Sequence, residues 1–288
     1  MKNDKTLAAQ LPSCRAAKIL VTGANGMLGQ DLCPILEDEG YEVIETDINN
    51  LDITDSDMVR EVLYNQKPDI VIHCAAYTNV DKAEEDIKTA RLINVTGTEN
   101  IAKVCSEIDA VMVYISTDYV FNGEGTKPYI PDDNANPINN YGLTKFEGEE
   151  AVRKYCQKYY IARTSWLYGI HGKNFVETMI SLADKPELKV VDDQVGCPTW
   201  TVELSNGIVK LLDSADFGTY HVCGSGQTSW YGFAKEIFKL SMLNVNLKPC
   251  TTAEFPRPAK RPKYSVMENF GICRRWESAL KDYIKLRD

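Results

Sequence analysis

Short apolar runs rich in β-branched residues alternate with stretches of helical periodicity through the first half of the chain. The first run, Lys18 to Thr22, precedes a segment from Met27 to Glu39 in which apolar residues recur at helical spacing. Further strands are predicted at 41–46, 70–74, 110–116 and 159–164, and further helices at 57–66, 84–107 and 141–156. Such alternation predicts an α/β fold with a doubly wound parallel sheet of the Rossmann type.

The alternation weakens after Tyr168. Helices are expected near 174–183, 202–212 and 229–243, with short strands and loops between them. We therefore predict a doubly wound domain over residues 18–168, joined by a later strand near 219–223, and a smaller C-terminal domain over residues 169–288. Residues 1–17 are polar and are interpreted as an N-terminal tail.

Composition and charge narrow the classes of partner. Hydrophobic residues make up 44% of the chain and charged residues 25%, as in ordinary globular proteins. The formal charge is −9, so a nucleic-acid partner is not expected. No apolar run approaches the roughly 20 residues needed to span a bilayer. Nine cysteines without a CxxC pair, and three histidines away from zinc-ligand spacing, favour free thiols in a reducing cytoplasm.

A glycine-rich segment follows the first predicted strand and opens the first predicted helix. Gly23, Gly26 and Gly29 fall within seven residues. Glycines allow a tight turn and close approach to the backbone, and the N-terminus of a helix attracts a pyrophosphate. The position favours dinucleotide binding. The alternative is a turn that serves only close packing of strand and helix.

Asp47 ends the second predicted strand, where a carboxylate can accept hydrogen bonds from the ribose hydroxyls of an adenosine. It would repel a ribose 2′-phosphate, and residues 48–53 contain no Lys or Arg to compensate. This pattern favours NADH as the cofactor, with NADPH still usable. The alternative is a solvated carboxylate at the end of a strand.

Tyr141 and Lys145 lie four residues apart on a predicted helix and so share one face. An ammonium near a phenol lowers the pKa of that phenol and suits it to proton transfer. Ser116 and Thr117 end the strand before this helix, at the sheet edge where α/β proteins bind ligands. Each signal alone is weak, because a Tyr-x-x-x-Lys sequence arises by chance and a strand-end hydroxyl often only terminates the strand.

Together, the Gly-x-x-Gly-x-x-Gly segment, the hydroxyl-bearing strand end and Tyr-x-x-x-Lys resemble the extended short-chain dehydrogenase/reductase family. Longer strings are similar to those of the dTDP-4-dehydrorhamnose reductases within it. They are Val21 to Gly29, Ala75 to Asp81, Ser116 to Phe121, Tyr141 to Lys145, Arg163 to Tyr168, Asp193 to Thr199, and Arg261-Pro262. The resemblance covers the chain from Lys18 to its end.

The resemblance implies roles for residues at matching positions. Tyr141 would be the proton donor, Lys145 would bind the nicotinamide ribose and tune Tyr141, and Thr117 would assist. With the glycines and Asp47, the cofactor would be lined by Gly26, Met27, Leu28, Asp52, Ile53, Ala75, Ala76 and Tyr77. The sugar nucleotide would contact Thr78, Thr117, Asp118 and Trp166. Two departures are Cys197, where the family has a small residue, and Tyr77, where it often has His.

The implied activity is NAD(P)H-dependent reduction of the 4-keto group of dTDP-4-dehydro-L-rhamnose to dTDP-L-rhamnose, a nucleotide sugar for cell-surface polysaccharide. One alternative is a sugar-nucleotide epimerase or dehydratase, although dehydratases of this fold have Asp-Glu after the strand-end Thr and this chain has Asp118-Tyr119. Another is a non-catalytic subunit resembling the regulatory subunit of methionine adenosyltransferase. Some members bind Mg²⁺ at a dimer contact, and Glu203 matches one such position, so a homodimer and a Mg²⁺ site both stay open.

Several other polar and aromatic residues are given ordinary structural interpretations. His171 is expected on the surface. Glu147, Glu149 and Glu150 are expected to form a solvated helix face, and Trp230, Tyr231 and Phe233 to pack a helix in the second domain. Among the basic residues 257–263, we favour Arg261 for a place near the substrate diphosphate, because guanidinium pairs well with phosphate oxygens.

Overall fold

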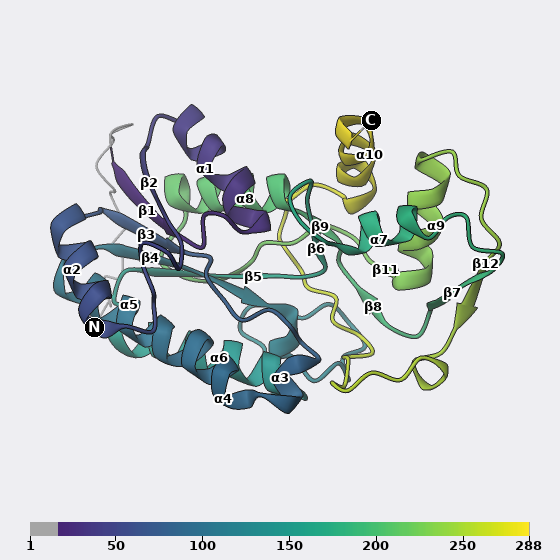
Figure 1. Cartoon of the computed structure of the whole chain (residues 1–288), viewed down its shortest axis with the longest axis horizontal. Helices are drawn as coiled ribbons and strands as arrows, with labels where there is room; N and C mark the ends of the chain where they lie inside the picture. The colour runs from purple at the N-terminus through teal and green to yellow at the C-terminus, as the bar shows by residue number, and fades with distance from the viewer. Residues whose placement is uncertain (1–16, 288) are drawn as a thin grey trace, which may run out of the picture.

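A six-stranded parallel sheet forms the centre of the larger part of the molecule (Figure 1). The computed structural model describes residues 17–287, so the tail expected for residues 1–17 lies outside the described residues except for Ala17. The strands are β1 (Lys18–Thr22), β2 (Glu42–Thr46), β3 (Ile70–His73), β4 (Val111–Thr117), β5 (Tyr159–Thr164) and β10 (Gly218–His221). Their order is β10-β5-β4-β3-β1-β2 and every pair is parallel, which confirms the predicted doubly wound sheet.

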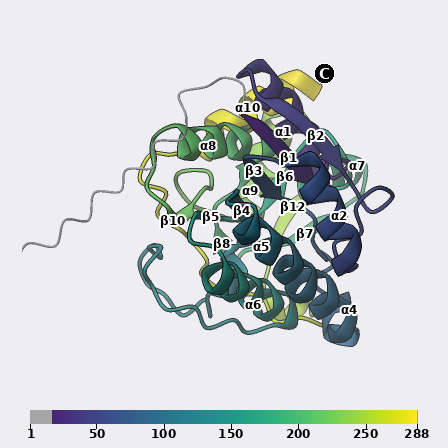
Figure 2. The same cartoon turned by 90° about the vertical axis from the view of Figure 1, so that its left-hand side faces the viewer.

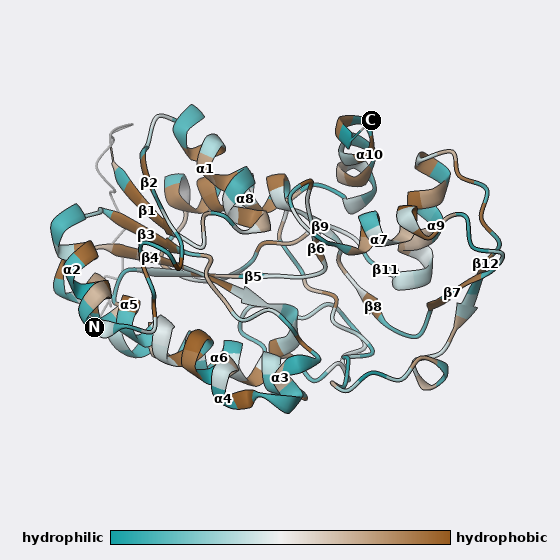
Figure 3. Ribbon diagram, in the orientation of Figure 1, coloured by the Kyte–Doolittle hydropathy of each residue, from teal (hydrophilic) through white to brown (hydrophobic). Residues whose placement is uncertain are grey.

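Helices cover both faces of this sheet (Figure 2). One face carries α1 (Met27–Asp38) and α8 (Thr201–Ser214), which pack through residues such as Leu32 and Ile208. The other carries α2 (Ser56–Gln66), α5 (Thr98–Glu107) and α6 (Asn140–Tyr155). Figure 3 shows hydrophobic residues concentrated on the strands between these layers. Burial of two apolar faces explains why the strands are continuous apolar runs rather than alternating ones.

The strand order reverses between β1 and β3, and ligands of open α/β sheets bind at such a reversal. The loops that follow these two strands touch. Gly23 has a φ of +68°, and a Cβ there would lie 2.8 Å from the backbone nitrogen of Ala75. Only glycine allows both the conformation and the approach.

The prediction of a single helix over residues 84–107 is wrong. The segment is divided into α3 (Lys82–Glu85), α4 (Ile87–Arg91), a π-helical turn η1 (Leu92–Gly97) and α5. Asp86 interrupts it because its side chain accepts a hydrogen bond from the Thr89 amide and caps α4. In η1 the buried Asn94 exchanges hydrogen bonds with the Tyr77 backbone and donates to the Thr144 hydroxyl. These tertiary bonds hold the irregular turn.

Within residues 17–287, a smaller part contains three two-stranded sheets (Figure 1), and two of them, β6–β9 and β7–β12, contribute to an aromatic core. The strand pairs are β6 (Leu167–Tyr168) with β9 (Thr199–Trp200), β7 (Leu188–Val191) with β12 (Leu247–Cys250), and β8 (Val195–Gly196) with β11 (Thr228–Ser229). Its helices are α7 (Phe175–Ser181), α9 (Trp230–Leu240) and α10 (Trp276–Arg287), with 3₁₀ turns η3 at Thr252–Glu254 and, in the larger part, η2 at Asp118–Val120. The sequence analysis did not predict α10, although Trp276, Leu280 and Ile284 form one buried stripe on it.

Candidate active site

A cavity of about 910 Å³ opens at the carboxyl edge of the main sheet. Its walls come from the loops after β1, β2, β3 and β4, from α6, and from the start of the smaller part. Most of the residues singled out from the sequence line it: Gly23, Gly26, Met27, Leu28, Gly29, Asp47, Asp52, Ile53, Ala75, Ala76, Thr78, Thr117, Asp118, Tyr141, Lys145 and Trp166. The fold therefore gathers these side chains into one place, and the ligands assigned to them stay predictions.

The glycine loop is shaped for close approach. A Cβ on Gly29 would lie 2.4 Å from the carbonyl oxygen of Ala24, so helix α1 packs directly on the turn. Gly26 is the N-cap of α1; no side chain caps the helix there, and its first turn holds no acidic residue. The first amides of α1 thus remain for an anion, which fits the pyrophosphate of a dinucleotide.

Asp47 joins the end of β2 to this loop. Its Oδ2 accepts a hydrogen bond from the Asn25 amide at 3.1 Å, and its Oδ1 accepts one from the Ile48 amide at 2.7 Å. The carboxylate also lines the cavity. Lys173, which the sequence analysis did not single out, lines the same cavity and supplies a cation from the loop before α7.

Tyr141 and Lys145 lie on α6 beside Thr117 at the end of β4. Burial raises the pKa of Tyr141 to about 12, opposed by a hydrogen bond with Thr117. The phenol therefore holds its proton. Burial lowers the pKa of Lys145 to about 7, opposed by the charge of Glu149. The sequence analysis expected Lys145 to lower the pKa of Tyr141, but burial raises it instead. The Lys145 ammonium lies over a different ring, 4.0 Å from the centre of Tyr114.

Asp118 is a buried carboxyl with a free acceptor. It is 2% exposed, its Oδ1 accepts a hydrogen bond from the Thr117 hydroxyl at 3.2 Å, and its Oδ2 has no partner. Burial raises its pKa to about 7, opposed by hydrogen bonds from Ser265 and Thr117. The residue lines the cavity, while Oδ2 itself is covered by its neighbours.

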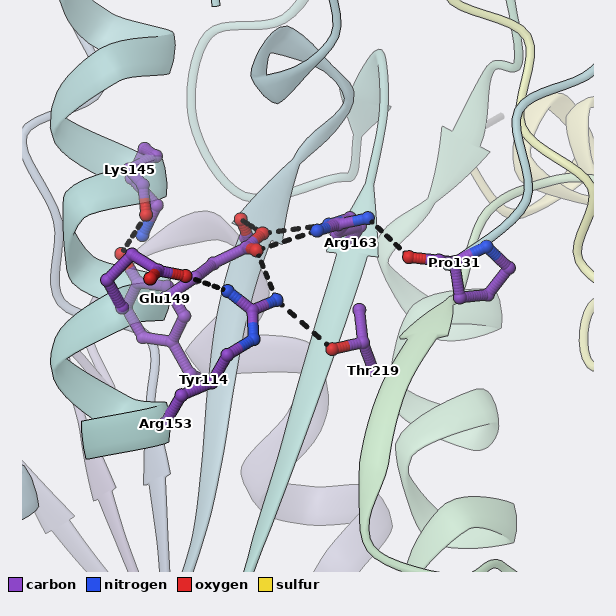
Figure 4. A network of polar contacts seen from close by, with 9 residues as sticks. Tyr114, Pro131, Lys145, Glu149, Arg153, Arg163 and Thr219 are labelled. Atoms are coloured by element: carbon purple, nitrogen blue, oxygen red, sulfur yellow. Dashed lines mark hydrogen bonds and ion pairs between the residues drawn. The ribbon is translucent and has the colours of Figure 1, made fainter. Parts of the chain in front are cut away.

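Glu149 is not on a solvated face, as the sequence analysis expected. It is fully buried, and Figure 4 shows it on α6 near Lys145. Tyr141, Lys145 and Glu149 follow one another at intervals of four residues, so they share one face of α6. Arg163 of β5 donates to both of its carboxylate oxygens at 2.8 Å, and Ser116 of β4 donates at 2.6 Å. Although burial raises the pKa of Glu149, the Arg163 guanidinium holds it below its usual range. This network fixes α6 against the ends of β4 and β5. The other two glutamates are surface residues: Glu147 pairs with Arg91, and Glu150 pairs with Arg153.

Three of the selected residues lie away from the cavity wall. Tyr77 is absent from the lining, and its amide donates to Asn94. Arg261 donates to Asp81 at 2.8 Å and does not line the cavity either. Glu203 pairs with Arg274 at 2.7 Å. No group of three or more His, Cys, Asp or Glu side chains among residues 17–287 is arranged to hold a metal, so nothing there adds ligands to Glu203.

Sequence reasoning missed part of the wall. Strand-end position could have found Cys74 and Thr164, which follow or close buried strands. Thr89, Leu92 and Ile93 reach the cavity only because α4 and η1 replace a continuous helix, so no sequence signal marks them. The other unpredicted lining residues are Ile48, Leu51, Thr54, Val80, Ile115, Tyr119, Ser165, Leu167, Lys173 and Trp230.

A doubly wound sheet, a glycine loop at its reversal point and a Tyr–Lys pair on α6 define a protein of the extended short-chain dehydrogenase/reductase class. The family model described as "RmlD substrate binding domain" matches residues 17–287, and the chain belongs to this family.

Individual relatives agree with this assignment. The chain is 45% identical over 277 residues to the spore coat polysaccharide biosynthesis protein SpsK of Bacillus subtilis, covering 94% of this chain and 98% of that protein. It is similar to the crystal structure of a dTDP-4-dehydrorhamnose reductase from Clostridium acetobutylicum, with a TM-score of 0.91, 49% identity and coverage of 93% and 99%. The Bacillus anthracis dTDP-4-dehydrorhamnose reductase, solved in complex with NADP, has a TM-score of 0.91, 42% identity and coverage of 94% and 99%.

None of the helices in the described part of the chain is long and apolar enough to cross a membrane.

Proposed function

We propose that this chain is an NAD(P)H-dependent reductase that converts dTDP-4-dehydro-L-rhamnose to dTDP-L-rhamnose. The observation that carries the proposal is that the Tyr141 phenol, the Thr117 hydroxyl and the glycine loop line one cavity. Burial raises the pKa of Tyr141, which keeps the proton on the phenol. The relatives named as dTDP-4-dehydrorhamnose reductases support the substrate. A proton donor and a dinucleotide cradle in one cavity are what carbonyl reduction requires.

The residues of the chain bind and protonate the keto oxygen. A bound nicotinamide cofactor supplies the hydride to C4 of the sugar. Tyr141 donates its proton to the oxygen that gains charge, and the Thr117 hydroxyl turns its hydrogen from Asp118 to the same oxygen. Lys145 carries the charge that stabilises the phenolate left on Tyr141. Asp118 lines the same cavity and would contact the sugar, as its resemblance to the family implies.

The two alternative functions fit less well. A dehydratase would need an acidic residue after Asp118, and the position holds Tyr119. A binding subunit would not require the proton donor and the lysine, yet both line the cavity. Membership of the RmlD family favours the reductase over either alternative.

For the cofactor we propose a preference for NADH with NADPH still accepted. Asp47 next to the glycine loop supports the preference, because its charge repels a 2′-phosphate. The NADP complex of the Bacillus anthracis relative supports the use of NADPH.

We also propose a reducing, cytoplasmic location. It is supported by the free thiols of Cys33, Cys74, Cys105, Cys156, Cys197, Cys223, Cys250 and Cys273.

The decisive experiment follows NADH consumption with dTDP-4-dehydro-L-rhamnose, using the Tyr141→Phe variant as the control. We expect consumption in large excess over the protein and dTDP-L-rhamnose as the product. An epimerase or dehydratase recycles its cofactor, and a binding subunit consumes none. NADH consumption that does not exceed the amount of protein would contradict the proposal.

A further inference from the structure

Trp166 stands on a strained backbone at the end of the cavity formed by the smaller part. Its φ is +46°, a conformation that bulky residues rarely adopt and that surrounding contacts must enforce. Its indole stacks on that of Trp230, with ring centres 3.5 Å apart and planes 6° apart. Both rings line the cavity. Two segments that are 64 residues apart in the sequence thus form one aromatic wall.

Gly196 confines the Trp166 indole from a third segment. A Cβ on Gly196 would lie 2.6 Å from Cε2 of Trp166, so the ring rests directly on that backbone. Gly196 lies in β8, which pairs with β11, and β11 leads directly into Trp230. The β8–β11 pair therefore brings both neighbours of Trp166 to the same place.

A buried amide fixes the Trp230 ring. Nε1 of Trp230 donates to Oε1 of Gln194 at 3.2 Å, and Nε2 of Gln194 donates to the Thr252 hydroxyl at 2.9 Å. That hydroxyl donates in turn to Asp193 at 2.6 Å. Phe175 packs against Trp230 with ring centres 4.6 Å apart. The hydrogen bond to Gln194 and the packing of Phe175 together hold the indole of Trp230 in this orientation.

We propose that Trp230 is a positioning residue that, held by Gln194, keeps Trp166 in place, so that the two indoles form the wall on which the sugar of the substrate rests. The proposal rests on the proposed function, because it names the part of that cavity that orients the sugar. This role explains why the strained backbone of Trp166 is retained. Trp230 and Gly196 hold the Trp166 indole where it can orient the reacting carbon of the sugar toward Tyr141.

Core packing alone does not explain the pair. Trp276 lies in the same aromatic core, with its ring centre 5.7 Å from that of Phe233, and does not line the cavity. Trp230 packs in that core and also faces the cavity. Trp276 is therefore the matched control for a purely structural tryptophan.

The test compares Trp230→Leu, Trp230→Phe and Trp276→Phe with the wild type. Loss of an aromatic pair is expected to raise the KM for the nucleotide sugar about three- to tenfold in Trp230→Leu and to lower kcat. Trp230→Phe keeps a ring and should recover most of the KM, and Trp276→Phe should leave it unchanged. The affinity for NADH, measured without substrate, should stay constant in all three. An unchanged KM in a folded Trp230→Leu protein would overturn the proposal.

Gly196→Ala provides a second route if Trp230→Leu fails to fold. The added methyl must displace the Trp166 indole and should raise the KM while Trp230 stays intact. An unchanged KM here would also contradict the proposal.

Nuclear magnetic resonance gives a readout independent of turnover. The chain has four tryptophans, so each indole N–H signal is assignable by substitution. Trp166 should lose a ring-current shift in Trp230→Leu and should move when dTDP-L-rhamnose is added. If the wild type neither reduces the keto sugar nor binds this product, the proposed function fails. If the wild type does both and the variants behave alike, only the role of Trp230 fails.

Discussion

Burial decides the charge of the individual groups in this site. The carboxyl of Asp118, the ammonium of Lys145 and the phenol of Tyr141 all have pKa values that burial shifts toward the neutral form. The phenol and the carboxyl are then available to a ligand in their neutral forms, because a neutral buried group keeps hydrogen-bonding capacity at a lower desolvation cost than a charge. Lys145, with a pKa of about 7 and the charge of Glu149 opposing the shift, can still hold a proton when a phenolate forms on Tyr141. A cavity built this way binds a polar sugar and transfers a proton within it.

Tyr141→Phe should retain cofactor binding and lose most turnover, because the ring stays and the proton donor goes. General acid catalysis contributes about 10²- to 10⁴-fold, and the loss of kcat should fall in that range. Steady-state kinetics and a separate NADH titration measure the two effects. Turnover close to that of the wild type would remove Tyr141 from its role.

Asp118→Asn should make stability less dependent on pH. The folded protein holds the Asp118 proton up to about pH 7, whereas the unfolded chain releases it near pH 4. Between these values the folded state binds more protons, so this group lowers stability as pH rises. Thermal unfolding at pH 5 and pH 8 should show the variant gaining on the wild type at the higher pH. If the Tm of the variant differs from that of the wild type by the same amount at both pH values, the raised pKa of Asp118 is contradicted.

Asp47→Ala should narrow the preference for NADH over NADPH, mainly through a lower KM for NADPH. The wild-type carboxylate repels a 2′-phosphate in a partly desolvated cleft, where charges interact more strongly than in bulk water. The measurement is kcat/KM for both cofactors in both proteins. If the wild type favours NADPH, or if the variant keeps the same ratio of kcat/KM for the two cofactors, Asp47 does not discriminate between a free and a phosphorylated ribose.

At the scale of elements, helix α6 carries Tyr141 and Lys145, and contacts on both sides of this pair hold the helix in place. Asn139 caps its start by accepting a hydrogen bond from the Gly142 amide at 2.8 Å, one residue after Tyr141. Two turns further along, Glu149 holds the helix to β4 and β5 (Figure 4). The spacing of Tyr141, Lys145 and Glu149 therefore combines two functional groups and one anchor on a single face.

Glu149→Leu should destabilise the protein by about 3–5 kcal/mol, because it leaves the buried Arg163 guanidinium without its partner. Urea unfolding measures the change, and Glu147→Gln is the control on the same helix. Glu147 forms an exposed pair with Arg91, so that variant should cost about 0–1 kcal/mol. Similar losses in both variants would mean that the Glu149 network contributes little to stability.

The sequence predicted the elements that obey a local rule and missed those set by distant contacts. Strand β1 and helix α1 follow from an apolar run, a glycine turn and helical spacing, which are all local. The break at α4 and η1 depends on Asn94 meeting Tyr77 and Thr144, and the burial of Glu149 depends on Arg163 from another strand. The helical periodicity around Asn94 and the neighbouring charges around Glu149 did not indicate these distant partners.

At the scale of the whole molecule, the cavity is assembled from two parts of the chain. The loops of the main sheet supply Gly23, Asp47 and Ala75, and the start of the smaller part supplies Trp166 and Lys173. The smaller part is bound to the sheet by α8, which packs on α1, and by β10, which pairs with β5. Cofactor and substrate should accordingly depend on different regions.

Trp166→Ala tests this division. The cofactor cradle belongs to the sheet loops, so the affinity for NADH should barely change. The sugar should lose its aromatic contact, which raises the KM, and its reacting carbon should lie less well placed under Tyr141, which lowers kcat. Kinetics with the nucleotide sugar and a direct NADH titration separate these effects, with Trp276→Phe as the control in the same aromatic core. If NADH binding weakens as much as sugar binding, Trp166 supports the whole cavity rather than the substrate, and the two regions do not act separately.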